Sequence, residues 1–224
     1  MKALNWATIA FLSIGSPVFA QSMQVAEMAA DRCMYSEALD FLSKAPATER
    51  ESRAGLLFQA RMLLQLEKGA DAVSILSRLK KSPSHAEEAE RLLCLGMALT
   101  SAKRFADAQA VLIDARKNGA DADLVEIAIA TILIDQGKLT DAEASLRAIL
   151  RRSSLLSGAL YNLGVVRVRR GDLAEAAALV RQAWYSGMHD PDQLKRDPDL
   201  APLIARKGLL DDLLATTIPK CGTY

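Results

Sequence analysis

The sequence predicts an all-α solenoid of about five helical hairpins, closed by a C-terminal capping helix. Hydrophobic residues make up 50% of the 224 positions, enough for a continuous core. Aromatic residues make up only 5%, and this alanine- and leucine-rich composition favours closely packed helices over sheets. The third observation is a pair of small residues, twelve positions apart, that recurs along the chain.

The first twenty residues have the pattern of a secretory signal peptide. Lys2 precedes an apolar stretch over 7–14, and Pro17 breaks it shortly before Val18-x-Ala20, a small-residue cleavage site. An uncleaved membrane anchor is the alternative, but the apolar stretch is shorter than the ~20 residues that a spanning helix needs. We therefore expect cleavage after Ala20, giving a periplasmic protein with no membrane attachment.

Five copies of one unit follow the leader. Each copy has a small residue, eleven intervening residues and then alanine, and the copies are 34, 36, 34 and 34 residues apart. The pairs are Ala26 with Ala38, Ala60 with Ala72, Gly96 with Ala108, Ala130 with Ala142, and Gly164 with Ala176. The predicted units are 21–52, 53–88, 89–122, 123–156 and 157–190.

Each unit is predicted to be two helices joined by a turn. Four residues after the second small position a large aliphatic residue recurs, a spacing that keeps both on one helix face; these residues are Leu42, Leu76, Leu112, Leu146 and Val180. Gly137 and Gly171 suit the left-handed residue that ends a helix, and Asp172 or Thr140 could cap the next helix. Gly164 is expected where two helices cross closely, opposite Ala176.

The fifth copy carries Leu160, Leu163, Gly164, the turn Gly171-Asp172, Ala176 and Ala183. This pattern resembles the tetratricopeptide repeat (TPR) family, although Arg167 replaces a bulky apolar residue and no copy ends in the usual proline. The resemblance implies a right-handed solenoid whose first helices line a concave surface that binds extended peptides or helices. Residues 191–224, with an apolar stripe that includes Leu200, Leu203, Leu210 and Leu213, are predicted to form the capping segment and tail.

Carrying the family's concave surface onto this chain gives a mostly apolar candidate site for a protein partner. The predicted groove residues are Leu57, Arg61, Leu64, Leu93, Met97, Ile127, Ile134, Tyr161, Val165 and Val168. The lysine and asparagine set with which some TPR domains clamp a C-terminal carboxylate is not implied, because only Asn162 lies nearby. The alternative is that the groove is filled by its own curvature or by the C-terminal segment.

The sequence gives no support to catalysis, a cofactor or a metal. His85 and His189 lie three units apart, and no phosphate loop, nucleophile elbow or zinc-binding motif occurs. Adjacent carboxylates such as Glu87 and Glu88 point about 100 degrees apart on a helix, so we expect them on a solvated face. Without Lys2 the 28 basic residues become 27 against 27 acidic ones, which does not favour nucleic acid.

Charged and sulfur-containing residues leave two questions open. Arginines cluster in the fourth and fifth units around Arg152, Arg167 and Arg181, where they serve either an acidic partner or solubility.

Three cysteines enter an oxidising compartment, and the simplest interpretation is a buried core Cys94 with Cys33 and Cys221 free. A bond between Cys33 and Cys221 would need the two chain ends to meet, and in an extended array they would not; an intermolecular bridge through Cys221 is the alternative.

The predicted function is that of a non-enzymatic scaffold or adaptor of the bacterial cell envelope. TPR proteins that resemble this one often assist the assembly of pili or secretion systems. The alternative is a periplasmic holdase-type chaperone that binds apolar segments of its clients, and self-association is left open.

Overall fold

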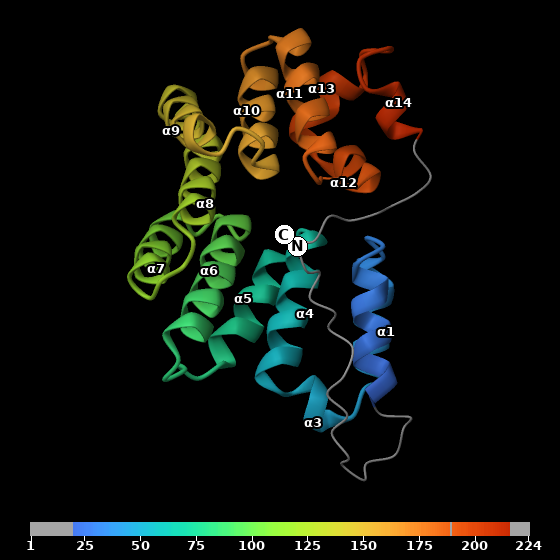
Figure 1. Cartoon of the computed structure of the whole chain (residues 1–224), viewed down its shortest axis with the longest axis vertical. Coiled ribbons are helices and arrows are strands. Elements are labelled where there is room, and N and C mark those ends of the chain that lie inside the picture. The colour runs from blue at the N-terminus through green and yellow to red at the C-terminus, as the bar shows by residue number, and fades with distance from the viewer. Residues whose placement is uncertain (1–19, 189, 216–224) are drawn as a thin grey trace, which may run out of the picture.

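The computed structural model describes residues 20–188 and 190–215, so the predicted leader lies almost entirely outside the described residues. Over these residues the chain is built from helices (Figure 1). None of the described helices combines the length and the apolar character needed to cross a bilayer. The paired helices are α1 (Ala20–Ala30) with α2 (Tyr35–Ser43), α4 (Arg53–Gln65) with α5 (Gly69–Arg78), α6 (His85–Ser101) with α7 (Phe105–Lys117), α8 (Ala122–Asp135) with α9 (Leu139–Arg152), and α10 (Ser157–Arg169) with α11 (Leu173–Tyr185). A short helix that the repeat pattern does not predict, α3 (Ala47–Arg50), lies between α2 and α4.

All five hairpins turn through a residue in the left-handed region. These residues, with φ between 59° and 84°, are Cys33, Glu67, Lys103, Gly137 and Gly171. In every case the next amide donates a hydrogen bond back across the turn, as Lys138 N does to Leu133 O at 2.8 Å. Asp172 caps α11 by accepting from the amide of Glu175, whereas Thr140 lies inside α9 and is not a cap.

The small residues of the repeat lie where helices of one hairpin cross. All five alanines of the second set have no exposed surface, and neither do Ala26, Ala60 and Ala130 of the first set. A Cβ built on Gly164 would lie 3.1 Å from Val180 Cγ2 and 3.5 Å from the backbone oxygen of Ala176. Gly96 is tighter, because its Cβ would lie 2.5 Å from Leu112 Cδ2. The repeated small residues therefore permit a close crossing of helices.

The residues after α11 do not form the single capping helix that the sequence predicts. They form four short pieces: α12 (Pro191–Arg196), the 3₁₀ turn η1 (Pro198–Leu200), α13 (Ala201–Ile204) and α14 (Asp211–Leu214). A single helix does not form because Pro198 stands 34 residues after Gly164, in the middle of what would be the first helix of a sixth unit. Leu194, Leu200 and Leu203 are fully buried against the fifth hairpin, so the segment still closes the end of the core.

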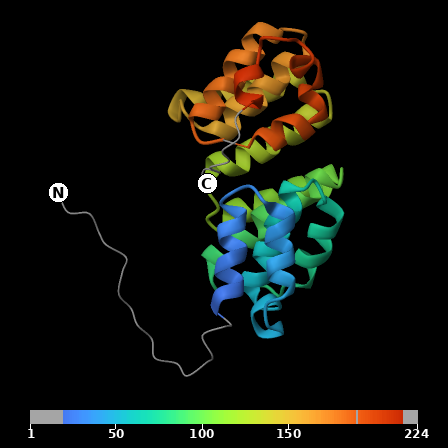
Figure 2. The same ribbon diagram turned by 90° about the vertical axis from the view of Figure 1, so that its right-hand side faces the viewer.

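The array curves so that its two ends approach each other. Going round Figure 1, the helices run from α1 through α6 and α8 to α12, which returns to the side of α1. The perpendicular view places the N-terminal hairpins below and the C-terminal units above (Figure 2). A pocket of about 280 Å³ is lined jointly by the α1–α2 turn and by Asp192 and Arg196 of α12. The ends of the array are therefore neighbours in space.

Candidate partner-binding surface

The inner side of the curve is lined by the first helices of the hairpins. Successive first helices contact one another, α4 with α6, α6 with α8 and α8 with α10. The second helices α7 and α9 lie on the outside of the curve (Figure 1). A partner on the inner side would therefore meet side chains of α4, α6, α8 and α10.

Half of the predicted groove residues form an accessible surface, which we call the open strip: Arg61, Leu64, Leu93, Met97 and Ile127. Met97 is 45% exposed, an unusual position for a large apolar side chain at the centre of a helix. Leu64, Leu93 and Ile127 are half-buried. Arg61 is exposed and pairs with Glu90 at 3.5 Å, so the strip is apolar with a charged pair on it.

The other five predicted groove residues are not available to a partner in this structure. Tyr161, Val165 and Val168, the closed end of the groove, are buried in a cluster that includes Leu194 and Leu200 of the C-terminal segment. Leu57 and Ile134 are also buried in the core. The C-terminal segment therefore packs against the fifth hairpin, whereas the residues of the open strip keep exposed surface.

Two polar contacts hold the C-terminal segment at the closed end. The Tyr161 hydroxyl donates a hydrogen bond to Asp197 Oδ2, and Arg169 pairs with Asp199 at 2.6 Å. Burial raises the pKa of the Tyr161 hydroxyl, and the nearby carboxylates of Asp197, Asp199 and Glu67 raise it further. Burial also raises the pKa of the Asp197 carboxyl, against the opposing effect of its hydrogen bond with Tyr161. Tyr161 therefore stays a donor at neutral pH.

A series of ion pairs links the ends of successive first helices. Lys103 pairs with Asp135 at 2.9 Å, Asp135 with Arg169 at 3.7 Å, and Arg169 with Asp199 at 2.6 Å. Each pair crosses from one unit to the next. The pairs thus connect the third to fifth hairpins and the C-terminal segment in series.

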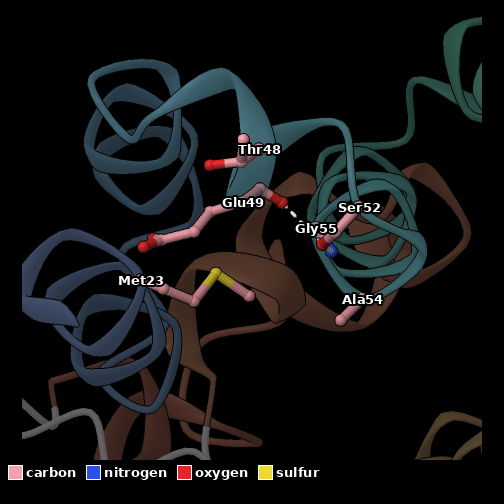
Figure 3. Close-up of a pocket in the computed structure, with 6 residues that line it drawn as sticks. All are labelled: Met23, Thr48, Glu49, Ser52, Ala54 and Gly55. Atoms are coloured by element: carbon pink, nitrogen blue, oxygen red, sulfur yellow. Dashed lines mark hydrogen bonds between the residues drawn. The ribbon is translucent and has the colours of Figure 1, made fainter. Parts of the chain in front are cut away.

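A second hollow lies where α1, α3 and α4 meet (Figure 3). It has a volume of about 310 Å³ and is lined by Met23, Thr48, Glu49, Ser52, Ala54 and Gly55. Ser52 caps α4 by accepting from the Gly55 amide at 3.0 Å. The repeat pattern could not predict this hollow, because α3 lies in a segment that the pattern treats as a connection.

Much of the charge in these clusters is paired within the chain. Glu88 is buried, and its carboxylate accepts from Arg91 and from the amide of Ser82, so the expected solvated face is wrong for this residue. The hydrogen bond from Arg91 holds the pKa of Glu88 below its ordinary value. Arg152 pairs with Asp123 and Glu126, and Arg167 with Glu143. Arg152 thus links the two helices of the fourth unit, and Arg167 joins the fifth unit to the fourth.

The cysteines differ from the simplest interpretation at one position. Cys94 is a free, buried thiol in the core, and burial raises its pKa to about 11. Cys33, in the first turn, is disulfide-bonded rather than free. Cys221 and His189 lie outside the described residues. Among the residues that the structure does describe, no group of three or more histidine, cysteine or carboxylate side chains could hold a metal ion.

Comparisons with known proteins agree with the repeat and the fold. The sequence model of the tetratricopeptide repeat family matches residues 127–191. TTC0263, a thermophilic TPR protein of Thermus thermophilus, superposes with a TM-score of 0.61 at 19% identity, covering 83% of this chain and 96% of its own. PilW, a widely conserved type IV pilus biogenesis factor, superposes with a TM-score of 0.53 at 17% identity, covering 89% of this chain and 91% of PilW. No curated protein matches the sequence.

The fold therefore defines an all-helical repeat array. Residues 127–191 match the tetratricopeptide repeat family, and the fold of the whole array is similar to that of TPR proteins. Sequence reasoning missed Leu124, which is 39% exposed on α8, three residues before Ile127 of the open strip. Its position one helical turn before Ile127 could have indicated that Leu124 lies on the same face of α8.

Proposed function

We propose that this protein is a non-enzymatic scaffold of the bacterial cell envelope that holds an extended peptide or a helix of a protein partner on the open strip. The observation that carries the proposal is the exposure of Met97 among half-buried Leu93 and Ile127, on the inner side of a TPR array. Exposed apolar surface of this kind marks interaction sites on otherwise well-packed proteins. The pairing of buried Glu88 with Arg91 and of half-buried Glu143 with Arg167 supports a structural rather than a catalytic role for these carboxylates.

The cellular setting is a separate part of the proposal. The first twenty residues support export and cleavage after Ala20, which predicts a mature protein whose N-terminal residue is Gln21. We propose assembly of pili or secretion systems as the process, in keeping with the TPR architecture that the chain shares with PilW. N-terminal sequencing of the protein recovered from the periplasm tests the first point independently of any partner.

The partner itself is tested by crosslinking in native cells followed by mass spectrometry. The variant Leu93→Asp, Met97→Asp, Ile127→Asp places three charges on the open strip, and Ile113→Asp, Tyr185→Asp changes two exposed apolar residues of α7 and α11 as a control. We expect one dominant partner that the strip variant loses at least tenfold and the control retains. A partner retained equally by both variants would refute the placement of the site.

A holdase-type chaperone is the second candidate, and Met97 is the observation that favours it. Methionine is flexible and polarizable, and exposed methionines are typical of surfaces that accept many partners. The same crosslinking experiment separates the two functions, because a chaperone would yield many unrelated clients. Recovery of a second copy of this chain would instead indicate self-association.

A further inference from the structure

An exposed face of α1, the first helix of the array, carries two apolar side chains. Met28 is 56% exposed, and Val25, three residues earlier on the same side of the helix, is 36% exposed. Gln24 and Arg32, four residues on either side of Met28, are exposed as well. We call these four residues the edge face, because α1 lies at the edge of the array and no described helix lies beyond it (Figure 1). The terminal unit of a solenoid ordinarily presents a polar outer face, so this face indicates a contact that the chain does not make by itself.

The repeat shows which contact is missing. Residues at the repeat position of Met28 are buried in the first helices of the other four units: Met62, Ala98, Ile132 and Val166. Each of them lies in one buried cluster with residues of the preceding second helix, as Val166 does with Ala142 and Leu146 of α9. Among the described residues no second helix precedes α1, and Met28 is therefore left exposed.

The second helices define the chemistry of a helix that would cover this position. In the four second helices that a further unit follows, alanine stands four residues before leucine, and these residues are almost fully buried: Ala38 with Leu42, Ala72 with Leu76, Ala108 with Leu112, and Ala142 with Leu146. The helix α9 adds a charged contact, because Glu143 pairs with Arg170 at the end of α10. Arg32 holds the repeat position of Arg170 and is exposed, so it can accept the same kind of carboxylate. The complementary sequence is thus Ala-Glu-x-x-Leu on one side of a helix.

We propose that the edge face binds an amphipathic helix of a partner protein, which takes the place of a second helix before the first unit. The alanine and leucine of that helix cover Val25 and Met28, and its glutamate pairs with Arg32. A second copy of this chain does not supply such a helix, since its own second helices keep these residues in the core. The edge face is separate from the open strip, and the inference does not rest on the proposed function.

A peptide with the sequence of residues 138–153, which contains α9, is the probe for this site. A short helix is marginal in water, so a hydrocarbon staple between positions 140 and 144, which are exposed in the array, holds the peptide helical. In an NMR titration of the mature protein labelled with nitrogen-15, we expect saturable shifts of the amide signals of Val25, Met28 and Arg32. Absence of saturable binding, or shifts confined to the open strip, would overturn the proposal.

Two exposed methionines provide a matched pair of variants. Met28→Asp should weaken binding of the peptide at least tenfold, whereas Met97→Asp, on the open strip, should leave it unchanged. Both side chains are largely in solvent, so both variants should melt at the wild-type temperature. Loss of binding in Met97→Asp but not in Met28→Asp would place the peptide on the open strip, which would refute the edge face and leave the proposed function standing.

A charge exchange tests the predicted ion pair. Arg32→Glu should weaken binding of the peptide about two- to fivefold, as expected for an exposed pair, and Glu143→Arg in the peptide should restore it. A peptide with Leu146→Asp is the control and should bind neither protein. Equal binding of the original and the Glu143→Arg peptide to both proteins would refute the charged contact. Size-exclusion chromatography of the protein alone should give a monomer; a dimer that Met28→Asp dissociates would assign the face to a second copy and overturn the proposal.

Discussion

Replacing Gly96 by alanine tests the close crossing of α6 and α7. A Cβ at residue 96 would lie 2.5 Å from Cδ2 and 2.6 Å from Cγ of Leu112, well inside contact distance. Leu112 has no exposed surface and cannot swing into solvent. Overpacking of this kind costs about 1–3 kcal/mol, and alanine regains about 1 kcal/mol of helix propensity over glycine. We expect the free energy of unfolding to fall by about 1 kcal/mol, which lowers the melting temperature by about 2–4 °C.

Gly164→Ala provides the matched comparison at the same repeat position. Its nearest neighbour, Val180 Cγ2, would lie 3.1 Å from the new Cβ, a contact that a shift of a few tenths of an ångström relieves. Propensity and crowding then nearly cancel, and we expect a change within about 0.5 kcal/mol of the wild type. Both variants are measured by urea unfolding with one spectroscopic probe, because repeat arrays can unfold in stages. If Gly96→Ala proved as stable as Gly164→Ala, the explanation of the small residues by helix crossing would fail.

Two further predictions concern the turn and the closed end. Lys103 holds a φ of 59° in the third turn, so Lys103→Gly should relieve about 1 kcal/mol of backbone strain, and the loss of its exposed ion pair with Asp135 costs less. The melting temperature should therefore rise slightly. Lys117→Gly inside α7 also removes an exposed ion pair, with Asp114, and should lower the melting temperature; a loss of stability at both positions would contradict the strain. Asp197 has a raised pKa because it is buried, so its charged form opposes folding at neutral pH and this cost disappears as pH falls through the raised value. Asp197→Asn should therefore be at least as stable as the wild type at pH 7, with an advantage that vanishes on titration to about pH 4, as urea unfolding at each pH would show. If the stability advantage of Asp197→Asn over the wild type grew as the pH fell, the raised pKa of Asp197 would be refuted.

The sequence allowed the buried positions of each hairpin to be predicted because the same packing recurs in every unit. Leu42, Leu76 and Leu146 are buried as their spacing predicts. The left-handed turn residues were predicted only where they are glycine. Cys33, Glu67 and Lys103 occupy the same place in the hairpin, and the common backbone hydrogen bonding of the turn imposes the conformation despite their side chains.

The closed end of the groove could not be predicted from the repeat. Tyr161 carries the residue type and spacing of a groove position, but what covers it is a segment whose own repeat pattern is broken by Pro198. The proximity of Cys33 to α12 could not be predicted either. It results from the curvature of the array, which accumulates from small rotations between successive units, and no local sequence pattern shows the total rotation. Glu88 likewise is buried by the loop that carries Ser82, which lies outside the helical periodicity.

Site-specific photocrosslinking at Met97 tests the central claim most directly. A photoreactive amino acid replaces Met97 on α6, and a second protein carries it at Ile113 on α7, which has a similar exposure of 51% against 45%. If the open strip holds a protein partner, light should join one defined protein to position 97 and not to position 113. Equal crosslinking at the two positions, or the same partner at position 113 alone, would contradict the account.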